Sequence, residues 1–145
     1  MPTRLASTLS LMLATIIAAP ALHAAERTPA PEGAAVYFIA PAAGSQLKSS
    51  VTVRFGLRGM GVAPAGIQLA DTGHHHLLVD VDALPALDQP IPADPHHVHF
   101  GKGQTETTIE LSPGKHTLQL LLGDFLHTPH QPPVMSERIE IDVLP

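Results

Sequence analysis

Hydrophobic and polar residues alternate along several short stretches of this chain, which is the pattern of β-strands with one buried face. Between positions 50 and 57 the apolar residues Val51, Val53 and Phe55 alternate with Thr52 and Arg54. Side chains of a strand point to opposite faces in turn, so such a stretch buries every second residue. Similar stretches, each bounded by Pro or Gly, lead us to expect about seven strands near 36–39, 50–57, 72–80, 96–100, 105–111, 116–122 and 139–143.

No stretch after position 25 has the apolar spacing of a helix, and proline-rich segments such as 84–95 fit neither a helix nor a central strand. This favours an all-β fold, a single antiparallel immunoglobulin-like β-sandwich over residues 36–145. The alternation also predicts a set of buried core residues: Val51, Val53, Phe55, Leu77, Val79, Leu118, Leu120 and Ile141.

The first 24 residues have the pattern of a signal peptide. Arg4 supplies a positive charge, positions 9–19 are apolar, and small residues lead up to Ala24 and Ala25. The apolar run is shorter than the roughly 20 residues that a permanent membrane anchor needs. We therefore expect residues 1–24 to be removed, residues 25–35 to be a flexible lead-in, and the mature protein to be periplasmic or secreted without a stable membrane anchor.

Charge and composition exclude nucleic acid as a partner. Removal of the predicted signal peptide removes Arg4, which leaves 8 − 1 = 7 Lys and Arg against 13 Asp and Glu. The formal charge of the mature chain is then 7 − 13 = −6. Nucleic-acid binding relies on clustered basic residues, and one Tyr and four Phe form no stacking surface for bases.

Histidine is the unusual component, with 10 residues in 145. Within two predicted strands, His74 and His76 share one face, and so do His97 and His99. A spacing of two along a strand places side chains about 6.5–7 Å apart, a separation that one metal ion can bridge. A third pair, His127 and His130, lies in a loop stiffened by proline.

These six histidines are the predicted ligands of a transition-metal ion. Imidazole suits copper, zinc, nickel and iron, and the chain has no cysteine thiolate. For an exported protein this favours copper, with zinc second, in a storage, chaperone or sensing role. Another periplasmic protein is a candidate partner. His75 and His116 lie on the core-facing side of their predicted strands. They are therefore expected to be hydrogen-bonded core residues and not ligands. Asp80 and Asp124 are candidates for orienting an imidazole through its second nitrogen.

Other readings of the same residues stay open. The histidine pairs also fit the solvated face of a strand, and in that alternative the protein is a structural or protein-interaction module that binds no metal. No serine lies in a nucleophile motif and no glycine-rich phosphate loop is present, so we expect a binding protein and not an enzyme.

Several motifs resemble the exported bacterial family known as domain of unknown function 4399. They are Tyr-Phe-Ile-Ala-Pro (37–41), the glycine-rich stretch 53–66, Thr-Gly-His-His-His-Leu-Leu (72–78), His-Phe-Gly-Lys-Gly-Gln-Thr-Glu (99–106) and Pro-His-Gln-Pro-Pro (129–133). The resemblance covers nearly the whole mature chain and implies an exported single domain. Separately, His-Val-His-Phe-Gly (97–101) looks like the His-Val-His segment of copper-zinc superoxide dismutases, which would imply a copper enzyme.

Overall fold

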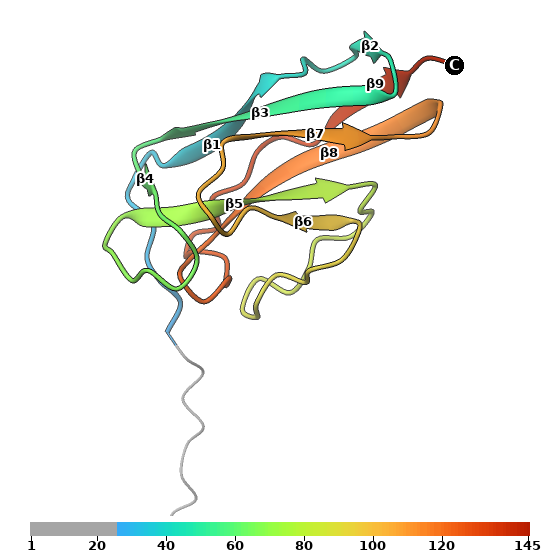
Figure 1. Cartoon of the computed structure of the whole chain (residues 1–145). Coiled ribbons are helices and arrows are strands. Elements are labelled where there is room, and N and C mark those ends of the chain that lie inside the picture. The colour runs from blue at the N-terminus through green and yellow to red at the C-terminus, as the bar shows by residue number, and fades with distance from the viewer. Residues whose placement is uncertain (1–25) are drawn as a thin grey trace, which may run out of the picture.

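The computed structural model describes residues 26–145, which form two stacked β-sheets (Figure 1). The strands are β1 Ala35–Ala40, β2 Gln46–Leu47, β3 Ser50–Arg58, β4 Gly61–Val62, β5 Thr72–Val79, β6 His97–His99, β7 Glu106–Glu110, β8 Gly114–Gly123 and β9 Ile139–Val143. The smaller sheet has the order β1-β3-β7. The larger sheet has the order β2-β9-β8-β5-β4, and β6 also pairs with β5.

This architecture confirms the predicted all-β sandwich. All seven expected strands are present, and the pairings among the longer strands are antiparallel. The two additional strands, β2 and β4, are only two residues long and pair in parallel with β9 and β5, so the larger sheet is mixed. A strand of two residues is too short to show an alternating pattern, so β2 and β4 could not be predicted from hydrophobicity.

The core lies between the two sheets, where the predicted residues are found. All eight side chains expected to be buried are buried in the main apolar cluster. Val53 of β3 and Leu120 of β8 are both 0% exposed, although they come from opposite sheets. Period-2 alternation was therefore sufficient to identify the inner faces.

Strand β5 differs from the others because it is buried on both faces. Leu77 and Val79 point into the core between the sheets, whereas Leu78 points outward. On that outer face Leu78 packs with Leu121 of β8 and with Ile91, which belongs to the long segment between β5 and β6. The outer side of the larger sheet is thus covered by chain, and it is there that the histidines gather.

Residues 26–34 differ from the expected flexible lead-in, because they are held against the loop that follows β8. Pro29 forms a parallel bridge with Gln131, and the Ala30 N–H donates to the Gln131 carbonyl at 3.0 Å. The Arg27 guanidinium donates to the backbone carbonyl of Pro129 at 3.0 Å. The sequence predicted a flexible segment, but hydrogen bonds to a distant part of the chain hold these residues in place.

The predicted signal peptide, residues 1–24, lies outside the described residues. Within residues 26–145, no helix is long and apolar enough to cross a membrane.

The position of the core predicts that alanine substitutions at two leucines change the free energy of unfolding by different amounts. Leu120→Ala should lower the free energy of unfolding by about 2–5 kcal/mol, because it leaves a cavity between the sheets. Leu69→Ala, at a side chain that is 62% exposed, should change it by less than about 0.5 kcal/mol. Urea denaturation of both variants measures the difference, and equal losses would contradict the placement of the core.

Candidate metal centre

Three consecutive histidines near the start of β5 define the site. Strand alternation directs His74 and His76 to the outer face of the larger sheet and His75 to the core, where its ring lies 5.1 Å from that of Phe55. All three are at most 1% exposed. Burying three imidazoles in succession is unusual, since a polar group taken from water needs a new partner.

His99 reaches the same outer face from the neighbouring strand. In the pairing of β5 with β6, His99 stands directly opposite His76. Its side chain is exposed, and its ring lies against Gly101, where a Cβ would collide with it. Glycine at position 101, which has no side chain, therefore leaves the space that the His99 ring occupies.

His127 comes from the loop between β8 and β9, and its position is set by hydrogen bonds to its backbone. Its φ of 68° is in the left-handed region. The His127 N–H donates to the Asp124 carbonyl and its own carbonyl accepts from the Ile91 N–H, both at 2.9 Å.

Asp124 shapes this loop from its first position. Its carboxylate Oδ1 accepts hydrogen bonds from the backbone N–H groups of Leu126 and Thr128, both at 2.9 Å. Aspartate commonly stabilises turns in this way. The other oxygen, Oδ2, accepts from the Thr28 hydroxyl at 2.6 Å. Asp124 thus holds the backbone around His127, and it does not orient an imidazole as the sequence suggested.

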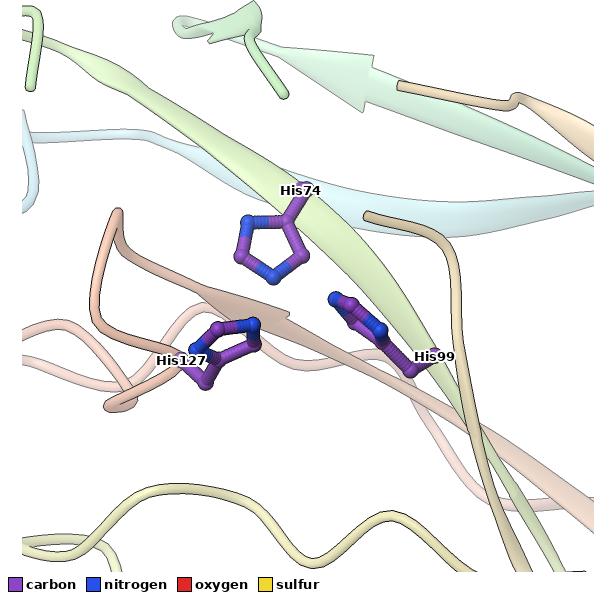
Figure 2. A group of neighbouring side chains, drawn as sticks. All are labelled: His74, His99 and His127. Atoms are coloured by element: carbon purple, nitrogen blue, oxygen red, sulfur yellow. The ribbon is translucent and has the colours of Figure 1, made fainter. Parts of the chain in front are cut away.

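These segments bring three imidazoles together from distant parts of the chain. One ring nitrogen from each of His74, His99 and His127 lies within 4.8 Å of the other two (Figure 2). The ring centres are 5.0 Å apart for His74 and His99, 5.0 Å for His74 and His127, and 4.7 Å for His99 and His127. His74 is buried, His127 half-buried and His99 exposed, so the group is reached from solvent on the side of His99.

His76 lies beside this group. Its ring centre is 4.9 Å from that of His74 and 5.1 Å from that of His99. A Cβ at Gly123 would stand 2.7 Å from Cε1 of His76, so glycine at the end of β8 makes room for this ring. Gly123 was not predicted from the sequence to be part of the site. A glycine that ends an apolar strand nevertheless often marks a point where another group comes close to the backbone.

The buried nitrogens of these rings have no hydrogen-bond partner. In the part of the chain that the structure describes, neither nitrogen of His74 has a partner, and Nδ1 of His76 has none. An unsatisfied buried polar group costs about 1–3 kcal/mol. Each neutral imidazole has one nitrogen with a free lone pair, so the cluster presents unused donor atoms that a metal ion could accept.

Burial keeps these imidazoles neutral. Desolvation, with further contributions from His127 and His99, lowers the pKa of His74 to about 4. Desolvation followed by the charges of His74, His99 and His127 lowers the pKa of His76 to about 3. Burial and the neighbouring His127 also lower the pKa of His99. Metal binding requires the neutral ring, so the cluster is in the binding form at neutral pH.

Two of the six predicted ligands are placed elsewhere. His97 stands opposite Leu78, and its Nδ1 lies 2.9 Å from the Asp94 carboxylate. His130 is fully buried, and its Nε2 lies 3.1 Å from the Thr72 carbonyl. A Cβ on Gly73, which would point to the core side of β5, would meet the His130 ring at 2.9 Å. Of the six, the structure therefore gathers His74, His99 and His127, with His76 adjacent.

The two histidines expected in the core behave differently from each other. His116 fits the hydrogen-bonded reading, since Nδ1 lies 2.7 Å from the Asp80 carboxylate and Nε2 lies 2.8 Å from the Ser112 carbonyl. Asp80 thus orients His116 and not a ring of the cluster. His75 is buried, yet neither of its nitrogens forms a hydrogen bond. Burial lowers the pKa of His75 to about 4, and the backbone of Gln104 acts in the opposite direction.

Comparison with known proteins identifies a sequence family for this chain but no individual protein. One family model, described as a domain of unknown function (DUF4399), matches residues 53–144. No curated protein and no solved structure matches the chain. The local likeness of residues 97–101 to copper-zinc superoxide dismutases therefore has no support.

The buried histidines make stability depend on pH. As the pH falls below about 6.5, the unfolded state takes up protons on His74, His75 and His76, whereas the folded state takes them up only near pH 3–4. Stability is therefore fully present above pH 6.5 and is lost towards pH 4, with each group contributing up to about 1.4 kcal/mol per pH unit.

Urea denaturation at pH 7 and pH 4.5 should show this loss. Titration of the histidine Cε1–H signals by NMR is the matching residue-level measurement. His116 is the internal control. Desolvation acts to lower its pKa, but the hydrogen bonds to Asp80 and Ser112 raise the pKa overall, so its contribution is lost as the pH rises. Titration of His74 and His76 near pH 6.5 in the folded protein would contradict the burial of the cluster.

Proposed function

The chain belongs to the DUF4399 family, a domain of unknown function, and we propose that it is an exported protein that binds a transition-metal ion through His74, His99 and His127. Copper is the favoured ion and zinc the second. The role is that of a binding protein in metal storage, delivery or sensing.

The convergence of three imidazole nitrogens within 4.8 Å of one another is the observation that carries the proposal. These ligands come from β5, from β6 and from the loop after β8, so only the folded chain assembles them. Two nitrogens of His74 lack a partner in a buried position, and an ion bound to one of them would relieve that cost. A hydrogen-bonding role explains His116 well, but it does not explain this cluster.

The donor set supports copper and zinc over harder ions. Mg²⁺ and Ca²⁺ require oxygen ligands, whereas imidazole suits copper and zinc. The Asp124 carboxylate is close enough to influence the pKa of His74, but both its oxygens accept hydrogen bonds from Thr28 and the loop backbone. The exposed His99 provides a route by which an ion enters from solvent or passes to a partner protein.

Export is part of the same proposal. It is supported by the sequence of residues 1–25, with Arg4, the apolar run and the alanine-rich junction. Mass spectrometry of the protein from its native cell envelope tests it, and a mature N-terminus near Ala25 or Glu26 is expected. Intact Met1 on that protein would contradict export.

Two histidines of β6 offer a matched pair of variants for the metal site. His99→Ala should weaken binding more than about 100-fold, since even the loss of an outer-shell partner costs up to that much. His97→Ala, two residues away and engaged with Asp94, should leave affinity nearly unchanged. Titration calorimetry with Cu(II), Cu(I) and Zn(II) measures both, on protein purified without a His-tag.

The same titrations decide between this proposal and a structural or interaction module without metal. A bound ion should also raise the melting temperature of the wild type, because it stabilises only the folded state. If the wild type and His99→Ala bind equally weakly and neither shows a thermal shift, the metal-binding proposal is wrong. The protein would then be a structural or interaction module.

A glycine beside the site provides a test that removes no ligand. Gly101→Ala places a Cβ where the His99 ring now lies, so the exposed ring must turn away from His74 and His127. The affinity for Cu(I) and Zn(II) should fall at least about tenfold, while the melting temperature of the metal-free protein changes little. Gly61→Ala, at another glycine without a positive φ, where the added Cβ meets only Thr72 Cγ2 at 3.4 Å, controls for the glycine-to-alanine change itself. Undiminished affinity of Gly101→Ala would separate His99 from the site.

A further inference from the structure

We infer that His76 is a fourth ligand and that the site is a tetrahedral four-imidazole site for a closed-shell ion, Cu(I) or Zn(II). This inference rests on the proposed function and specifies the coordination and the class of ion.

The spacing of the four rings is the first support. Five of the six distances between ring centres are between 4.7 and 5.1 Å, and the sixth, between His76 and His127, is 6.2 Å. Four nitrogens about 2.0–2.1 Å from one ion in a tetrahedral arrangement place neighbouring ring centres about 5 Å apart. The rings thus already occupy a slightly flattened tetrahedron, and binding requires mainly that they turn their nitrogens inward.

The surroundings of His76 are the second support. Its Nδ1 is buried without a hydrogen-bond partner, and the ring is 1% exposed. His74 precedes it by two residues on the same strand face, and His99 stands opposite it in β6. Gly123, opposite His74 in β8, leaves the space into which the His76 ring fits. A merely space-filling residue at this position would be better served by an apolar side chain, as at Leu78.

Two paired strands restrict how far this set can deform. His74, His76 and His99 are attached to backbone that is hydrogen-bonded in the sheet. Cu(II) and Ni(II) favour square-planar or tetragonal sites, whereas Zn(II) has no geometric preference arising from its d electrons. Cu(I) has the same closed shell, so a tetrahedron imposed by the fold favours these two ions.

X-ray absorption spectroscopy of the wild-type protein loaded with Zn(II), and separately with Cu(I), tests the inference directly. Scattering from the outer atoms of the imidazole rings should correspond to four rings. Competition titrations should show Zn(II) bound at least about tenfold more tightly than Ni(II), because Ni(II) meets the wrong geometry. A count of three rings, or tighter binding of Ni(II), would overturn it.

Variants test the same point independently. His76→Leu keeps the site filled but removes the donor, so Zn(II) affinity should fall more than about tenfold and the ring count should drop to three. Leu78→Ala, on the same face of β5, controls for loss of packing and should retain four rings. If the wild type binds no ion at all, the proposed function itself is wrong. If His99→Ala loses binding but His76→Leu retains the full affinity and ring count, only the fourth ligand is wrong.

Discussion

The burial of β5 on both faces is the constraint on which the rest of the structure depends. Its inner residues, Leu77 and Val79, join the two sheets, so the strand is fixed in register and cannot slip by one residue without reversing both faces. Its outer residues are therefore fixed as well. The same alternation that secures the core determines that His74 and His76 face the covered outer side, beside His99 and His127.

This arrangement has an energetic cost that packing alone does not remove. The unpartnered nitrogens of His74, His75 and His76 lie in or beside an apolar environment, and each would be better solvated in the unfolded chain. Apolar side chains at these positions would give a more stable sandwich. Sites that work against stability in this way are often functional sites, since function supplies the reason for retaining them.

The strands and the core could be predicted from the sequence because they depend on a local, repeating pattern. Val53 and Leu120 illustrate this, since each belongs to a long alternating stretch. His74 and His99 were predictable for the same reason. His97 was not, because a contact with Asp94, three residues earlier, draws its ring away from the cluster. His130 lies in a loop, where no periodicity indicates which side of β5 a side chain will reach.

The attachment of Arg27 to the loop near Gln131 has a consequence for the order in which the protein folds. These two residues are 104 positions apart, so their contact closes nearly the whole described chain into one loop. Contacts between residues so distant in sequence slow folding, because the entropy of closing the loop is lost before the contact forms. We therefore expect the attachment of Arg27 to this loop to form late, after the strands have paired. We expect an ion to meet an assembled sandwich and to have little part in directing the chain towards it.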